Sequence, residues 1–268
     1  MSWIKSHFLS FLLALQFFSR LPVKVDVYSP ERQAKILNYL PLIGLLFGSV
    51  LFVLVLFLGW QAMFLPSEVA FFILVIWIWL SGALHLDGVA DSADAALGSV
   101  GQKDIAQKIL HDSRIGTGGA VALALILLGK WVFLASLFTI FFMQTAFAGY
   151  LLLFASIPFI ARLVPLVLLK SCGSATASAG HKKVFAGLSW SALWGYLGLL
   201  LLWMSLIIYA EYFTVLLTLA SGFVLAWFFT HYFAKKLLGG VNGDLMGLSI
   251  EISELLLILA LLIGLRLA

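Results

Sequence analysis

The hydrophobic positions of this chain form long, uninterrupted runs, and short segments between the runs carry most of the charge. A helix needs roughly 20 consecutive apolar residues to cross a bilayer, and the runs are about that long. None of them shows the alternation of apolar and polar positions that is typical of an outer-membrane β-strand. The runs predict about seven transmembrane helices, at 38–62, 67–85, 118–138, 141–169, 190–210, 212–233 and 248–266.

Two of these segments are unusual. The run at 141–169 is long and contains Pro158 and Pro165, which we expect to kink or break the helix because proline lacks a backbone N–H and clashes with the preceding turn. The first helix, at residues 3–19, ends before Arg20 without a small-residue cleavage site, so we expect it to be retained as an amphipathic interfacial or re-entrant helix. The prediction is an all-α, polytopic membrane protein of one domain. It has an N-terminal helix and loop over 1–36 and a bundle over 37–268.

The composition agrees with this fold class. The chain is 63% hydrophobic and only 10% charged, and its mean hydropathy is +1.12. About a quarter of the residues of a soluble domain are charged, so a soluble globule is excluded. The single cysteine, Cys172, excludes an internal disulfide and a cysteine-based metal site. The pI is near 9.2, but the basic residues form no dense cluster, so nucleic acid is not an expected partner.

The basic residues predict the orientation. Four segments carry them: Arg20, Lys24, Arg32 and Lys35; Lys103, Lys108 and Arg114; Lys170, Lys182 and Lys183; and Lys235 and Lys236. Two predicted spans separate each segment from the next, and the intervening turns carry only Glu68 and Glu211. The positive-inside rule therefore places the four segments on the cytoplasmic side of a bacterial inner membrane.

A group of acids lies at this cytoplasmic face. Asp91 and Asp94 follow Asp87 by four and seven residues, so in a helix the three carboxylates share one face. They would repel one another unless a cation lay among them, and a hard divalent ion with oxygen ligands is the natural candidate. At a membrane edge, such a face indicates metal-assisted phosphate chemistry. His85, two residues earlier, is open to three interpretations: a ligand, an acid or base, or an interfacial histidine.

Two glycine-containing segments add polar residues. One spans 238–247 and contains Asp244, and Glu251 and Glu254 then enter an apolar helix, where ionisable groups are costly and usually functional. The other spans 111–119. Its Arg114 could clamp a phosphate, and its glycines lead into a helix whose N-terminus could face an anion. The plainer alternatives are a flexible turn for the first segment and a capped loop for the second.

Two basic residues lie inside predicted spans. Lys130 and Arg162 could each pair with an acid, bind phosphate or extend to the interface, and the sequence leaves these roles open.

Five motifs together resemble a known family. They are Ser19-Arg20-Leu21-Pro22, Pro41-Leu42-Ile43-Gly44, His85-Leu86-Asp87-Gly88-Val89-Ala90-Asp91-Ser92-Ala93-Asp94, Asp112-Ser113-Arg114-Ile115-Gly116, and Gly243-Asp244 with Glu251. Their order and spacing resemble the cobalamin synthase family, the adenosylcobinamide-GDP ribazoletransferases. The resemblance implies that α-ribazole or its 5′-phosphate joins adenosylcobinamide-GDP, with Mg²⁺ as cofactor and GMP as leaving group. A homo-oligomer, or association with other cobalamin-assembly enzymes, is left open.

The resemblance also implies residue roles. Asp87, Asp91, Asp94 and Asp244 would bind Mg²⁺ and, with His85, form the catalytic set. The expected substrate- and phosphate-binding residues are Arg20, Asp112, Arg114, Lys130, Arg162 and Glu251. One departure concerns the loop at 170–175, which lacks the arginine of a Tyr-Ala-Arg element that is frequent in the family.

Two other functions match parts of the sequence. A CDP-alcohol phosphotransferase resembles the acidic segment, but its Asp-Gly-x-x-Ala-Arg pattern fails here because Asp91 follows Ala90. A secondary transporter would suit the charges inside the spans, but its acids would lie near mid-membrane with access from both sides.

Overall fold

The structure is a computed structural model, and it describes residues 3–25, 29–61, 63–143, 147–175, 179–209 and 212–268. Within these ranges every regular element is a helix, and the only β-type contact is an isolated bridge between Ser174 and Val241. The helices are α1 (Trp3–Phe18), α2 (Pro30–Gln33), the 3₁₀ helix η1 (Ile36–Tyr39), α3 (Leu40–Trp60), α4 (Pro66–Ser81), α5 (Leu84–Gly98), α6 (Lys103–Leu110), α7 (Thr117–Met143), α8 (Phe147–Ala161), α9 (Val164–Cys172), α10 (Ala179–Ala186), α11 (Trp190–Tyr209), α12 (Phe213–Leu237) and α13 (Gly243–Leu267). The all-α prediction is confirmed.

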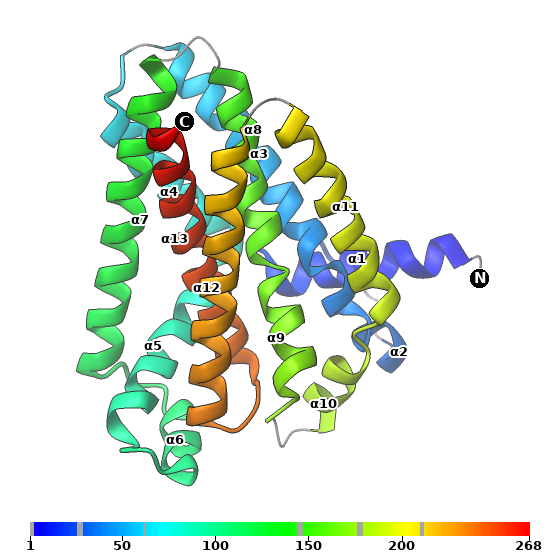
Figure 1. Ribbon diagram of the computed structural model, residues 1–268. Helices are drawn as coiled ribbons and strands as arrows, with labels where there is room; N and C mark the ends of the chain where they lie inside the picture. The colour runs from blue at the N-terminus through cyan, green and yellow to red at the C-terminus, as the bar shows by residue number, and fades with distance from the viewer. Residues whose placement is uncertain (1–2, 26–28, 62, 144–146, 176–178, 210–211) are drawn as a thin grey trace.

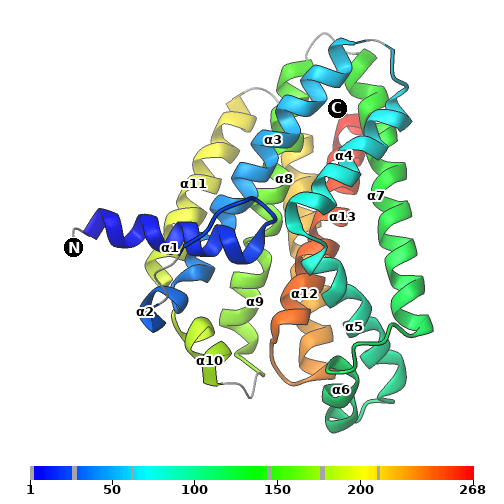
Figure 2. The same ribbon diagram turned by 180° about the vertical axis from the view of Figure 1, so that it is seen from behind.

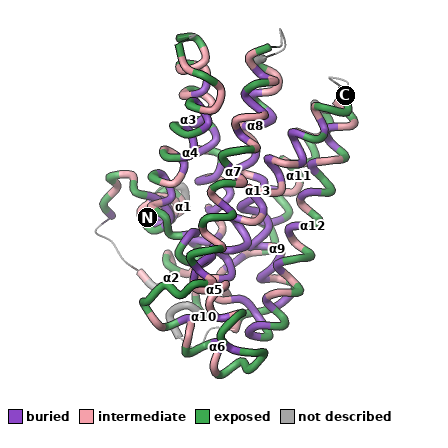
Figure 3. Tube along the Cα trace, turned by 90° about the vertical axis from the view of Figure 1, so that its left-hand side faces the viewer, coloured by how far each residue is buried: buried purple, intermediate pink, exposed green. Residues whose placement is uncertain are grey.

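The long helices form a bundle with α13 and the pair α8–α9 at its centre (Figures 1 and 3). In the most apolar stretches, 78% of the residues of Ala148–Cys172 and 67% of those of α13 are buried, against 28% for α7. The outer helices expose large apolar side chains, such as Leu225 and Phe228 of α12. These side chains would contact lipid in a membrane.

The number of spans is not confirmed as seven. Each predicted range overlaps one or more helices. Among the described residues, five spans are long and apolar enough to cross a bilayer, or six if α4 and α5 count as one bent span. The described part of α11 qualifies only as a shorter apolar helix. The N-terminal helix α1 lies across the bundle axis rather than along it (Figure 2), which agrees with the interfacial placement.

Proline breaks the long predicted span, as expected. Pro158 lies inside α8, Pro165 lies in the first turn of α9, and the helix is interrupted between them at Arg162 and Leu163. The interruption matters for the site because it holds the Arg162 side chain in the protein interior.

A sharp bend separates α4 from α5. Gly82 and Ala83 both adopt left-handed backbone conformations, with φ of 63° and 58°, and the two helices meet at 87°. For alanine this conformation costs about 1–2 kcal/mol. The predicted span 67–85 therefore ends at Ser81, and α5 turns away from the direction of the crossing helices.

The charge segregation seen along the sequence also exists in space. The helices α2, α5, α6 and α10 and the turn between α12 and α13 lie at one end of the bundle (Figure 1). The last turns of α3 and α7 and the C-terminus lie at the other end. Glu211, one of the two acids expected at that second end, lies outside the described residues.

Candidate functional site

The site begins where α5 crosses α13. A Cβ atom added at Gly88 of α5 would collide with the backbone carbonyl of Asp244, and one added at Gly247 of α13 would press on the backbone of His85. Glycine at both positions therefore lets the two backbones touch. This contact brings the acidic face of α5 to the first turn of α13, far away in the sequence.

Four carboxylates gather at this crossing. Burial, together with the negative charges of Asp87, Asp244 and Asp94, raises the pKa of Asp91 to about 6. Asp244 accepts a hydrogen bond from the amide of Asn242 (2.7 Å), which also caps α13 by accepting from the backbone N–H of Leu245. The expectation that α5 is helical and presents the acids together is therefore confirmed, and Asp244 joins them.

The donor set suits a hard cation, because it consists of carboxylate oxygens that repel one another. A divalent ion would relieve the repulsion that disfavours ionised Asp91. Among the described residues, however, no three His, Cys, Asp or Glu side chains are already gathered with metal-ligand spacing. The sequence-based assignment of Asp87, Asp91, Asp94 and Asp244 to Mg²⁺ stays a prediction. We narrow the proposed ligands to Asp87, Asp91 and Asp244, because both carboxylate oxygens of Asp94 accept hydrogen bonds from backbone N–H groups.

Asp94 has a structural task that the sequence analysis did not foresee. Its Oδ2 accepts from the backbone N–H of Gly116 (2.7 Å) and its Oδ1 from that of Gly119 (2.8 Å). These N–H groups belong to the start of α7, which was expected to face an anion. The anion in the structure is Asp94 itself, and a side chain at Gly116 or Gly119 would collide with it.

We expect Asp94→Ala to lower the free energy of unfolding by about 1–2 kcal/mol, because two N–H groups at the start of α7 lose their acceptor. The thermal midpoint in detergent measures this loss. The rise of that midpoint on adding Mg²⁺ should match the wild type, and Asp104→Ala, an exposed acid on α6, serves as control. An unchanged midpoint together with a lost response to Mg²⁺ would instead make Asp94 a metal ligand.

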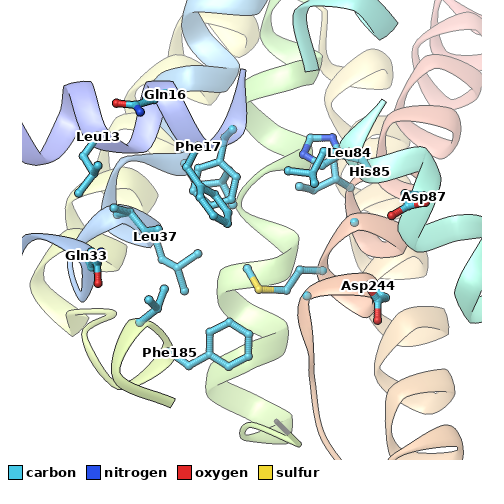
Figure 4. A pocket seen from close by; sticks show the side chains of 18 residues that line it. Leu13, Gln16, Phe17, Gln33, Leu37, Leu84, His85, Asp87, Phe185 and Asp244 are labelled. Carbon is cyan, nitrogen blue, oxygen red and sulfur yellow. The ribbon is translucent and has the colours of Figure 1, made fainter. Parts of the chain in front are cut away.

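A cavity of about 450 Å³ opens beside the carboxylates. Residues of α1, α2, η1, α3 and α10 form one side of it, and residues of α5 and α13 form the other. Asp87 and Asp244 lie together at one end, with His85 above them in the view of Figure 4.

His85 lies in the cavity wall and is 3% exposed. Both of its ring nitrogens lack a hydrogen-bond partner among the described residues, and Nδ1 is 3.8 Å from Oε1 of Glu251. Buried polar atoms are nearly always paired in native proteins. His85 is therefore a strong candidate to bind a ligand in this cavity.

Behind His85 lies a buried ion network. Lys130 Nζ of α7 donates to Glu251 and to Glu254 of α13, at 2.6 Å each. Glu254 also accepts from Arg162 (3.0 Å) and from the indole N–H of Trp77 (3.2 Å). Lys130, Arg162 and both glutamates are at most 4% exposed.

This network decides among the roles left open for the basic residues inside spans. Lys130 and Arg162 pair with acids and do not line the cavity, and Glu251 is occupied by Lys130. The geometry therefore gives no support to the expectation that these three residues bind phosphate. Lys130 donates to both glutamates and Arg162 Nη1 donates to Glu254, whereas Nε and Nη2 of Arg162 have no hydrogen-bond partner among the described residues. These ion pairs link α7 and the break after α8 to α13.

The remaining expected residues lie outside the cavity. Arg114 is exposed and donates to Asp112 (Nη2–Oδ2 2.6 Å), and these hydrogen bonds lower the pKa of Asp112 to about 2. Arg20 is exposed, and its side chain lies against Gly82 at the bend. Both guanidinium groups lie where a soluble anion could reach them.

Sequence reasoning missed the apolar side of the cavity. Phe17 of α1 and Phe185 of α10 line it, although they are separated by more than half of the chain. Their spacing carried no signal, because aromatic residues are frequent throughout this sequence. The partnership of Trp77 with Glu254 was missed for the same reason.

Comparisons with known proteins agree with the resemblance. The sequence model of a family described as cobalamin-5-phosphate synthase matches residues 10–262. A protein of Pseudomonas putida named adenosylcobinamide-GDP ribazoletransferase is 36% identical, covering 96% of this chain and 100% of its own. One of the same name from Acinetobacter baumannii is 29% identical, covering 95% and 97%. No solved structure matches the chain. The phosphotransferase and transporter alternatives are not favoured.

Proposed function

This chain belongs to the cobalamin-5-phosphate synthase family, and from that premise we propose that it joins α-ribazole or its 5′-phosphate to adenosylcobinamide-GDP. GMP leaves, and adenosylcobalamin or its 5′-phosphate forms. We infer these substrates from the name of the relatives, adenosylcobinamide-GDP ribazoletransferase. The observation that carries the proposal is the meeting of Asp87, Asp91 and Asp244, from two crossing helices, beside a ligand-sized cavity.

The bonds can be followed from substrates to products. A 5′-phosphate on the ribazole persists in the product, so the nucleophile is another hydroxyl of the ribose. Its oxygen forms a bond to the phosphorus that carries cobinamide, and the bridging bond to GMP breaks with its electron pair leaving on GMP. The hydroxyl proton needs an acceptor, and we assign this role to His85, because both of its ring nitrogens are unpaired in the cavity wall.

Mg²⁺ bound by the acids, together with the exposed arginines, would neutralise the negative charge of the phosphate groups. Asp87, Asp91 and Asp244 would hold Mg²⁺ through carboxylate oxygens, and Asp94 would fix α7 beside them. When bound, Mg²⁺ would neutralise negative charge on the pyrophosphate oxygens. Arg20 and Arg114 are the remaining candidates for phosphate contacts, because Lys130 and Arg162 are paired in the interior.

The proposed location is the bacterial inner membrane, with the site facing the cytoplasm. The site lies at the end of the bundle where α6, α10 and the last turn of α12 carry Lys103, Lys108, Lys182, Lys183, Lys235 and Lys236. The positive-inside rule supports a cytoplasmic position for this end. Water-soluble nucleotide substrates would reach it from that side.

The proposed activity predicts that membranes containing this chain, supplied with adenosylcobinamide-GDP, α-ribazole and Mg²⁺, form GMP and a complete corrinoid in equal amounts. Chromatography with detection of both products measures this, and chelation of Mg²⁺ should stop both. Membranes from cells without the chain are the control. Folded protein that makes neither product from α-ribazole or its 5′-phosphate would contradict the proposal.

A further inference from the structure

The cavity has two unlike ends. The carboxylates of Asp87 and Asp244 mark one end. The opposite end, formed by α1, α2, η1, α3 and α10, is mainly apolar, and the amides of Gln16 and Gln33 lie at its edge (Figure 4). Its main side chains are Leu13, Phe17, Phe18, Leu37, Leu40 and Phe185. A ligand that fills the cavity must therefore be apolar at one end and polar at the other.

The lining excludes several parts of the two substrates. Within the described part of the chain, no Lys or Arg lines the cavity, so its walls offer no basic side chain to a phosphate. The carbonyl oxygen of the Gln16 side chain already accepts from the backbone N–H of Val25 (2.9 Å). Guanine and the amide-bearing rim of a corrinoid both need many hydrogen bonds, and burying them here would leave polar atoms unpaired.

We propose that the apolar end of this cavity binds the aromatic base of the ribazole and directs its ribose towards Asp87 and Asp244. The inference rests on the proposed transferase function and assigns one substrate to a particular part of the site. A flat, weakly polar base of the benzimidazole kind matches the lining, and a volume of about 450 Å³ lies within the range of small-molecule sites.

Two aromatic rings are placed to contact the base. In the view of Figure 4, Phe17 lies on the upper side of the cavity and Phe185 on the lower side. Phe17 is 58% exposed, although it is a large apolar residue at a ligand-sized cavity. A base stacked against these rings would cover apolar surface and gain the contact energy that aromatic side chains give to nucleobases.

The ribose would then lie beside the reacting groups. His85 and Asp87 are both in the first turn of α5, on the carboxylate side of the cavity. A ribose hydroxyl at this end is close to the histidine with two unpaired nitrogens and to the acids proposed to hold Mg²⁺. The base thus anchors the nucleophile, while adenosylcobinamide-GDP approaches from outside the cavity.

The lining also predicts a selectivity. A purine base with an exocyclic amine would bury donors and acceptors against Leu37, Leu40 and Phe185, which offer no partner. Sites that leave polar groups unpaired discriminate strongly against the ligand that carries them. A ribazole with a benzimidazole base should therefore be preferred over the corresponding adenine riboside.

The test is the change in KM for each substrate in Phe17→Ala and Phe185→Ala. Each variant should raise KM for α-ribazole by about tenfold, the size expected for a lost stacking contact. The KM for adenosylcobinamide-GDP and kcat should stay within about twofold of the wild type. Phe8→Ala is a matched control, because Phe8 is also on α1, is 57% exposed and does not line the cavity.

Competition by free dimethylbenzimidazole gives a second measurement that needs no variant. It should inhibit competitively against α-ribazole and non-competitively against adenosylcobinamide-GDP. If the aromatic variants instead raise KM for adenosylcobinamide-GDP, or leave both KM values unchanged, this inference is wrong although the transferase function stands. A wild-type protein with no transfer at all would remove the proposed function itself.

Discussion

Replacing Asp91 by asparagine should reduce ribazole transfer by at least about 10³-fold in kcat. Asp91 lies among three other carboxylates, and their repulsion is what a bound divalent ion would offset. Asparagine keeps the size of the side chain but removes the charge that would hold the ion. Release of GMP from adenosylcobinamide-GDP at saturating α-ribazole measures the effect.

The same substitution should leave the metal-free protein at least as stable as the wild type, because one repelling charge is removed. Thermal unfolding in detergent would show an equal or higher midpoint without Mg²⁺, and a lost rise on adding Mg²⁺. Asp104→Asn, an exposed acid on α6, should behave like the wild type in both assays. Full transfer activity in Asp91→Asn would remove the argument for a metal site at this crossing.

Replacing Glu254 by glutamine should destabilise the protein by about 3–5 kcal/mol, the usual cost of leaving a buried charge without its partner. Glu254 faces Lys130 and Arg162, and its loss leaves one uncompensated positive charge in the interior. We expect the thermal midpoint in detergent to fall by roughly 6–20 °C.

A double variant separates charge balance from packing. Arg162→Gln combined with Glu254→Gln restores neutrality, since Lys130 keeps Glu251. The double variant should therefore be more stable than Glu254→Gln alone, and its loss of stability should be smaller than the sum of the losses in the two single variants. Glu31→Gln, an exposed acid on α2, should change the midpoint little. If the stability loss of the double variant equals the sum of the two single losses, these side chains stabilise the protein by packing and not by charge pairing.

Much of the fold could be predicted because hydrophobic length is a strong signal. The break near Pro158 and Pro165 followed from the missing N–H of proline and is present. The bend at Gly82 and Ala83 was not predicted, because left-handed alanine has no sequence signature and the apolar run from Val69 to Leu80 leads directly into it. Length and hydropathy alone also do not show how α4 and α5 are oriented, so the count of seven spans is not confirmed.

For the site, too, one part could be predicted from the sequence and another part could not. The i, i+4 and i+7 spacing placed Asp87, Asp91 and Asp94 on one face, and α5 confirms that face. The partners of Asp94, Lys130 and Arg162 are residues far away in the sequence, and no local pattern encodes such a contact. Asp94 caps α7, and Lys130 and Arg162 reach glutamates of the last helix. The sequence left the partners of these two cations open, and the structure pairs them with buried acids.

The charge pairs of the bundle core have a consequence for synthesis of the chain at the translocon. Lys130 precedes Glu254 by 124 residues, and Arg162 precedes it by 92. At about 5–20 residues per second, each cation waits roughly 5–25 seconds for its partner. Lipid is a poor environment for an unpaired charge during that interval. The early helices therefore cannot settle independently in the bilayer, and insertion of α13 is the step that completes the core.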